Sequence, residues 1–191
     1  MIDLSNIRRF TVDRPEGWSL FGSANEFDSL PETHREQILF LDKAASEYIF
    51  EFSTAAYLTT GGLWDPFAKG NFKAVEEFAD FSRTPESKQK LKKWLYNRGI
   101  PFQTWVYVLL NGNEPPMLMT WKMLIKYSDC LFLLDDVMIF DNTLNWCLIF
   151  FHEDRIFFGK DNIYNSNEDF KQMEELNVRK KKFPQFKHPY L

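Results

Sequence analysis

The amino-acid sequence predicts an α+β domain, in which N-terminal helices are followed by an antiparallel sheet of about five strands that ends in a three-stranded meander. Two observations carry this prediction. Apolar residues at helical spacing and helix-capping residues dominate up to residue 99, whereas short apolar runs separated by turn residues dominate residues 102 to 159. With 191 residues, the chain is long enough for one domain with a sizeable core.

The helices are predicted from caps and apolar stripes. We expect a short helix over Ser29 to Gln37, and a longer one that begins after Asp42 as its N-cap. Asn71 to Phe81 has an apolar stripe at helical spacing, which predicts a third helix. The next helix has the clearest bounds, with Thr84 as its N-cap and Gly99 as its stop signal.

Two strands and two short helices are expected in the rest of the chain outside the meander. Phe102 to Leu110 and Met117 to Met119 are extended apolar runs, and the Asn-Gly pair between them is a hairpin signal. Trp121 to Tyr127 places its apolar residues on one side and predicts a short helix. A last helix is expected over Glu168 to Leu176.

The meander is predicted from residues 128 to 159, the most apolar part of the chain. Turn-type residues separate three apolar runs, each of which we expect to be a strand: Val137 to Phe140, Trp146 to His152 and Arg155 to Phe158. Successive side chains on the central run point to opposite faces, and both sets are apolar. We therefore expect the sheet to be covered on both faces, or to be covered on one and held against a partner on the other.

Charge is unevenly distributed along the chain. Five of the 23 basic residues and none of the 27 acidic ones fall in residues 177–191, so residues 1–176 hold 18 basic against 27 acidic residues, a balance of −9. We predict a single α+β domain over 1–176 and a basic, loose tail over 177–191. An acidic body disfavours nucleic acid as the ligand and suits a basic protein partner, although net negative charge also serves solubility alone.

The sequence predicts a cytoplasmic protein that does not interact with a membrane. No run reaches the roughly 18 uncharged apolar residues that a membrane span needs, and the segment MIDLSNIRRF lacks the apolar core of a signal peptide. Cys130 and Cys147 lie in apolar surroundings, so we expect reduced, buried thiols rather than a disulfide or a metal site.

One cluster suggests chemistry at first sight, His152-Glu153-Asp154. Histidine and carboxylates together can bind a metal or transfer protons. Adjacent strand residues point to opposite faces, however, and the other histidines, His34 and His188, are distant in sequence. Patterns for a catalytic nucleophile are also absent from the sequence. We therefore predict no metal, no cofactor and no catalytic residue here, while an enzyme with a scattered site stays an alternative.

Three segments carry a resemblance to known proteins: Trp121 to Ile125, Leu131 to Ile139 (LFLLDDVMI) and Asn145 to Gly159 (NWCLIFFHEDRIFFG). A helix with Trp, an Asp-Asp turn and two strands joined by an acidic tip resemble the C-terminal half of small, mostly uncharacterised bacterial proteins. Some proteins of this style are immunity proteins of bacterial toxin systems. The resemblance implies a cytosolic protein that neutralises a toxin by stoichiometric binding, and it implies no catalytic residues.

The residues expected to contact such a toxin are the carboxylates at the turns of the sheet. They are Asp135, Asp136, Asp141, Glu153 and Asp154, and loops at one end of a rigid sheet can present such charges together. Toxins that degrade nucleic acids are often basic because they bind phosphates, so an acidic inhibitor suits them. Two alternatives stay open: a hydrolase or other enzyme with a carboxylate or histidine site, and a structural or regulatory protein. The sequence does not specify the oligomeric state.

Overall fold

A computed structural model describes residues 2–16, 18, 24–59, 64–67, 70–79, 81–110, 115–133, 135–162 and 171–185, with the backbone alone described at 24–25 and 171–176. The strands are β1 (Thr11–Val12), β2 (Ile38–Leu41), β3 (Phe72–Phe78), β4 (Trp105–Leu110), β5 (Met117–Thr120), β6 (Val137–Phe140), β7 (Trp146–Phe151) and β8 (Arg155–Asn162). The helices are the 3-10 helix η1 (Ile7–Arg9), α1 (Ala24–Asp28), α2 (Glu32–Arg35), α3 (Lys43–Ala55), α4 (Pro85–Tyr96), α5 (Trp121–Leu131) and α6 (Lys171–Lys182).

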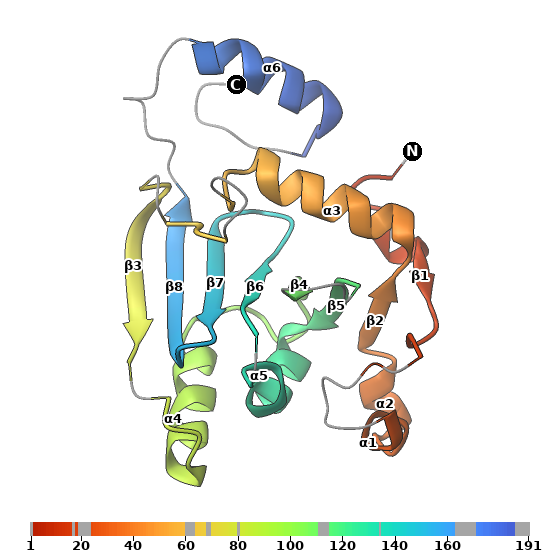
Figure 1. The fold of residues 1–191 in the computed structure, drawn as a ribbon, viewed down its shortest axis with the longest axis vertical. Helices are drawn as coiled ribbons and strands as arrows, with labels where there is room; N and C mark the ends of the chain where they lie inside the picture. The colour runs from red at the N-terminus through yellow and green to blue at the C-terminus, as the bar shows by residue number, and fades with distance from the viewer. Residues whose placement is uncertain are drawn as a thin grey trace.

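The described strands form one antiparallel sheet in the order β1-β2-β5-β4-β6-β7-β8-β3 (Figure 1). Helices cover both of its faces, so the domain has three layers. On one face α4 and α5 pack against the sheet around Leu91, Leu95 and Trp121. On the other face η1 and α3 pack against it around Ile7 and Phe52. Each face therefore has its own hydrophobic core, which gives both sides of the sheet an apolar environment.

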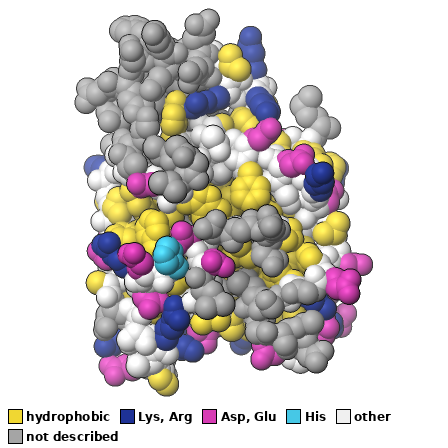
Figure 2. Space-filling view, in the orientation of Figure 1, with side chains coloured by type: hydrophobic (Ala, Val, Ile, Leu, Met, Phe, Trp, Pro, Cys, Tyr) yellow, Lys and Arg dark blue, Asp and Glu magenta, His cyan; other side chains and the backbone are white. Residues whose placement is uncertain are grey.

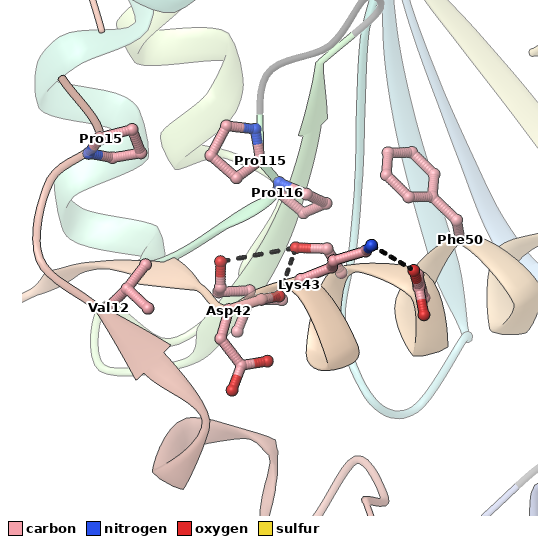
Figure 3. A pocket seen from close by; sticks show the side chains of 10 residues that line it. Val12, Pro15, Asp42, Lys43, Phe50, Pro115 and Pro116 are labelled. Carbon is pink, nitrogen blue, oxygen red and sulfur yellow. Dashed lines mark hydrogen bonds and ion pairs between the residues drawn. The ribbon is translucent and has the colours of Figure 1, made fainter. Parts of the chain in front are cut away.

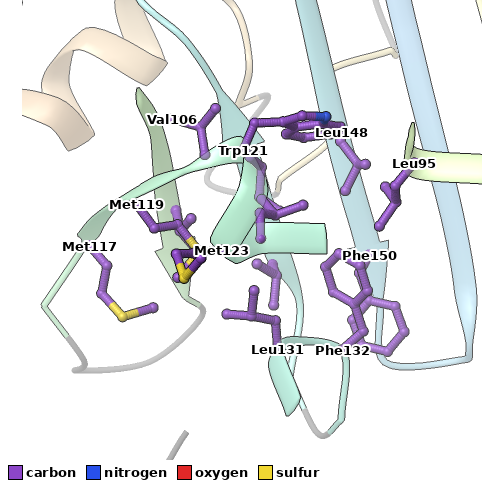
Figure 4. Packing of buried hydrophobic residues seen from close by; sticks show 14 of the residues in the cluster. Leu95, Val106, Met117, Met119, Trp121, Met123, Leu131, Phe132, Leu148 and Phe150 are labelled. Carbon is purple, nitrogen blue, oxygen red and sulfur yellow. The ribbon is translucent and has the colours of Figure 1, made fainter. Parts of the chain in front are cut away.

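Strand β7 lies inside the sheet, between β6 and β8, and all of its residues from Trp146 to Phe150 are buried. Phe150 stacks on Phe132 with 5.2 Å between the ring centroids, in the core shared with α4 and α5 (Figure 4). On the opposite face Cys147 belongs to the core under α3. The expectation that both faces of this strand are covered is confirmed, and the cover comes from the protein itself.

The α+β class is confirmed, but the predicted arrangement is wrong. The sheet has eight described strands rather than about five; β1, β2 and β3 were not expected, and of these β3 occupies a segment that was expected to be a helix. Strands β6, β7 and β8 are consecutive antiparallel neighbours, yet they do not end the sheet, because β3 pairs with the outer side of β8. Residues Ile38–Leu41 are apolar at all four positions, which is a pattern typical of a strand buried on both faces.

The helix predicted over Asn71 to Phe81 is wrong, because Phe72–Phe78 forms β3. The spacing of its apolar residues fits a short helix and a short strand about equally well, and long-range pairing decides between them. Glu77 accepts a hydrogen bond from Arg155 of β8 at 3.0 Å, and Glu76 lies 3.3 Å from the Nζ of Lys160. These partners are about eighty residues away in the sequence, so local periodicity could not reveal them.

The longer helices begin where their caps predicted. Oδ1 of Asp42 accepts the N–H of Ala45 at 2.8 Å at the start of α3. Oγ1 of Thr84 accepts the N–H of Ser87 at 3.2 Å at the start of α4, which ends at Tyr96, three residues before Gly99. The helix expected over residues 29–37 is reduced to α2. The loop at 111–114 of the predicted hairpin lies outside the described residues, although its two strands, β4 and β5, are antiparallel neighbours.

The C-terminal segment packs against α3 as far as it is described. Helix α6 extends to Lys182, beyond the end predicted at Leu176, and part of its predicted start lies outside the described residues. Phe183 is buried and lies 5.4 Å, centroid to centroid, from Phe52 of α3. Lys182 also forms an ion pair with Glu51. The division into a domain over 1–176 and a tail over 177–191 stays a prediction, but residues 177–183 are tied to the domain.

No helix in the described part of the chain combines the length and the apolar character that crossing a membrane requires.

Candidate binding surface

Four of the five predicted contact residues lie at one end of the sheet. Asp135 and Asp136 directly precede β6, and Glu153 and Asp154 lie in the turn between β7 and β8. Because β6 and β7 are antiparallel neighbours, the start of β6 adjoins the end of β7. The backbone N–H of His152 donates to Oδ1 of Asp136 at 2.9 Å, which joins the two segments directly. We call Asp135, Asp136, Glu153 and Asp154 the acidic end.

Asp141 does not belong to this group, and its expected grouping with the other four acids is wrong. It follows β6, at the opposite end of that strand, and only 5% of it is exposed. Its carboxylate accepts hydrogen bonds from the indole N–H of Trp146 at 2.9 Å and from the backbone and hydroxyl groups of Thr143 at 2.8 and 2.5 Å. These bonds hold the turn between β6 and β7, so Asp141 has a structural role.

Two acids of the acidic end form no hydrogen bond or ion pair with the described residues, and the other two form both kinds of contact. Asp135 and Glu153 are exposed and make no hydrogen bond or ion pair with the described part of the protein. Asp154 accepts a hydrogen bond from Arg83 at 2.6 Å, and Asp136 is held by His152. The solvated carboxylates of Asp135 and Glu153 are therefore available to attract a cation from outside.

The pKa of His152 is raised above its ordinary value of 6.5. The main cause is the hydrogen bond between its Nδ1 and Oδ1 of Asp136, which are 2.9 Å apart, and the negative charges of Asp136, Glu153 and Asp135 add to it. The folded chain therefore holds this proton more tightly than the unfolded chain. The resulting stabilisation is fully present below pH 6.5 and is lost as the pH rises through the folded-state pKa.

We expect Asp136→Asn to lower the pKa of His152 towards its ordinary value, because the variant removes the charged hydrogen-bond acceptor. NMR titration of the His152 ring protons measures the change directly. Asp154→Asn is the control, since Asp154 bonds to Arg83 rather than to His152. An unchanged His152 titration in Asp136→Asn would show that this pair does not exist in solution.

The described residues offer little for metal or thiol chemistry. No group of three His, Cys, Asp or Glu side chains among them is placed to hold a metal ion. Both cysteines are free thiols; Cys147 is buried, as expected, whereas Cys130 is only half-buried. Burial raises the pKa of the Cys147 thiol strongly and that of Cys130 to a lesser degree, which keeps both protonated at neutral pH and poorly nucleophilic.

An aromatic strip lies on the sheet beside the acidic end, and we define it as Phe67, Val75, Phe151 and Phe157. The rings of Phe151 and Phe157 are 5.7 Å apart, and both are half-buried. Val75 on β3 is 46% exposed. Arg155 lies with its guanidinium 4.8 Å from the centroid of the Phe157 ring. Figure 2 shows hydrophobic side chains gathered on this face of the molecule, directly beside acidic and basic ones.

Gly159 of β8 makes room for one end of the aromatic strip. A Cβ atom at this position would lie 2.4 Å from the ring of Phe67 and 2.8 Å from that of Phe72, so any side chain would displace them. The strip was not predicted from the sequence, because Val75 was expected on a helix. Phe151 and Phe157 lie in sequence on either side of the turn that contains Glu153 and Asp154, and this pattern could have indicated an aromatic surface beside the acidic end.

A second surface feature is a hollow of about 610 Å³ beside the start of α3 (Figure 3). Its apolar walls include Val12, Pro15, Phe50 and Pro116. The polar side chains there are engaged within the protein: Asp42 caps α3, Ser46 donates to the carbonyl of Asp42 at 2.7 Å, and Lys43 pairs with Glu47 at 3.9 Å. Each polar side chain among the described residues that line the hollow therefore has a partner within the protein, and we assign the hollow no function.

Comparison with models of protein families, with curated proteins and with solved structures found no match. The fold and the surface together define the class as an α+β domain, covered on both faces, that carries a charged and aromatic surface at one end of its sheet.

Proposed function

We propose that this protein is a non-catalytic binding protein that captures a basic protein partner through the acidic end and the aromatic strip, in the manner of an immunity protein that neutralises a toxin by stoichiometric binding. The observation that carries the proposal is the pair of exposed carboxylates, Asp135 and Glu153, which form no hydrogen bond or ion pair with the described residues and lie near the half-buried rings of Phe151 and Phe157. The choice of a toxin as the partner follows from the resemblance expected for Trp121 to Ile125, Leu131 to Ile139 and Asn145 to Gly159.

The two parts of the surface have different roles in this proposal. Solvated carboxylates attract a cationic partner over a distance of about one Debye length, roughly 10 Å at moderate salt, and so raise the association rate. Aromatic side chains are enriched among the residues that dominate binding energy, because they bury a large apolar area in a fixed shape. We therefore expect Asp135 and Glu153 to govern association, and Phe151 and Phe157 to govern dissociation.

We expect the double variant Asp135→Asn, Glu153→Gln to bind its partner about tenfold more slowly at low salt, with a smaller change in the dissociation rate. The partner to test is the purified product of the neighbouring gene, and stopped-flow association measured over a range of salt concentrations is the readout. The matched control is Glu32→Gln, Glu47→Gln, which removes the same charge from exposed positions on α2 and α3.

Two results would contradict this proposal. One is an association rate that responds neither to salt nor to the double variant, which would exclude electrostatic capture. The other is the absence of binding at low salt. A third result would limit the proposal. If the association rate depends on salt and the control variant lowers it as much as the double variant at the acidic end does, the whole acidic body attracts the partner and the acidic end has no special part.

A further inference from the structure

Strand β3 forms one edge of the described sheet (Figure 1). It pairs with β8 over its length, from Phe72 with Asn162 to Phe78 with Ile156, and no described strand pairs with its other side. The opposite edge, β1, is only two residues long. An edge strand of seven residues presents a row of backbone N–H and C=O groups that can pair with a strand from another chain.

The sequence of β3 is complementary to itself when two copies run antiparallel. We propose that β3 is the interface to a second copy of this chain, paired across a two-fold axis that passes through Val75. In this register Lys73 of each copy lies opposite Glu77 of the other copy. Opposite charges directly across an antiparallel pair stabilise it, and like charges destabilise it. The two Val75 side chains, each 46% exposed in the single chain, meet at the axis.

This register is the most favourable of those that the hydrogen-bond ladder permits near the middle of β3. When two identical strands pair antiparallel, the two-fold axis must pass through a residue and not between two residues. Only then do the residues whose N–H and C=O point outward lie opposite each other. An axis at Glu76 places two Glu76 carboxylates opposite each other. An axis at Ala74 pairs Phe72 with Glu76 and leaves Lys73 opposite Val75. Only the axis at Val75 pairs all seven residues, places Phe72 opposite Phe78 and creates no like-charge pair.

The side chains that this register uses share one exposed face of the sheet. Lys73, Val75 and Glu77 alternate with residues of the other face, so all three project from the same side of the sheet. Arg155 holds the Glu77 carboxylate at 3.0 Å on that side. Glu76 lies on the other face and forms ion pairs with Arg98 and Lys160. Its charge is therefore already compensated where it would lie opposite Ala74 of the second copy.

The dimer is expected to be weak and dependent on concentration. Pairing through a single edge strand buries little area compared with the roughly 1,200–2,000 Å² of stable interfaces. Sedimentation velocity of the full chain, from micromolar to millimolar concentration, is expected to show a shift from monomer towards dimer. A wild-type chain that stays monomeric over this range overturns the proposal.

A charge-swap experiment tests the register. Lys73→Glu leaves an acidic side chain at both positions of the pair, and Glu77→Lys leaves a basic one at both. Each variant alone should dimerise at least about tenfold more weakly than the wild type, because its cross-strand pairs carry like charges. An equimolar mixture of the two variants should associate again, because both cross-strand pairs then join a glutamate of one chain to a lysine of the other. A mixture that does not associate overturns the register.

Two controls separate this interface from general effects of charge or folding. Lys43→Glu makes the same charge change on α3 beside Val12, away from β3, and should leave dimerisation unchanged. Val75→Cys should form a covalent dimer with oxidised glutathione, since the two thiols meet at the axis. Val12→Cys, which has a similar exposure of 48% on β1, should form one far more slowly. Equal rates of crosslinking for these two variants would contradict the proposal even if Glu77→Lys does not fold.

Discussion

Replacing Phe150 with Asp is expected to abolish soluble folding. Phe150 is fully buried on β7, inside the sheet, where it stacks on Phe132 and lies edge-on to Phe81 at 6.0 Å. A carboxylate there would lie in the apolar cluster that contains Phe132 and Phe81, where it would lose its hydration. We expect a loss of more than about 4 kcal/mol in the free energy of unfolding, which approaches the whole stability of an ordinary domain.

The conservative variant Phe150→Leu is the control for this experiment. It leaves the position apolar and should fold, with a free energy of unfolding lower by about 1–2 kcal/mol. Circular dichroism and thermal melting of the soluble fraction give the measurement. A Phe150→Asp protein with the spectrum and melting temperature of the wild type would show that β7 does not lie in the core.

Replacing Asp141 with Ala is expected to lower the free energy of unfolding by about 3 kcal/mol, the second-largest effect among the proposed substitutions. The variant loses hydrogen bonds to a charged group and leaves buried donors without an acceptor. The indole N–H of buried Trp146 loses its acceptor at 2.9 Å, and Thr143 loses two bonds to the same carboxylate. The turn between β6 and β7 should open first.

Asp141→Asn should cost less than Asp141→Ala, because its amide oxygen can still accept from Trp146. Asp135→Asn, at the exposed acidic end, should change the stability by no more than about 0.5 kcal/mol. Urea denaturation of the three variants compares them under the same conditions. If Asp141→Ala and Asp135→Asn prove equally mild, the buried carboxylate is not what holds the turn.

Features that depend on a few neighbouring residues could be predicted from the sequence. The starts of α3 and α4 follow from Asp42 and Thr84, whose side chains accept backbone N–H groups three residues later. The burial of β7 on both faces follows from the absence of polar residues between Trp146 and Phe151. In each case, the physical cause lies within a few residues of the effect.

Features that depend on distant pairing could not be predicted in this way. The sequence of β3 has the apolar spacing of a short helix, and only its pairing with β8 shows that it is a strand. The same pairing places Val75 and Phe157 on one face and so forms the aromatic strip. The acidic end was predicted in part, because Asp135 and Glu153 belong to turns that meet when β6 pairs with β7. Asp141 was wrongly grouped with the exposed acids, because its burial and its bond to the indole of Trp146 arise only when the turn folds.

The pairing of β3 with β8 also has a consequence for synthesis of the chain. Phe78 pairs with Ile156, which is 78 residues later. At roughly 5–20 residues per second, a ribosome takes about 4–16 s to cover this interval, during which β3 has emerged without its neighbour. The core under α3 is completed later still, since Phe183 belongs to it. Folding of this domain is therefore completed only after Phe183 has been synthesised, and chaperones that shield apolar strands during those seconds should increase its yield.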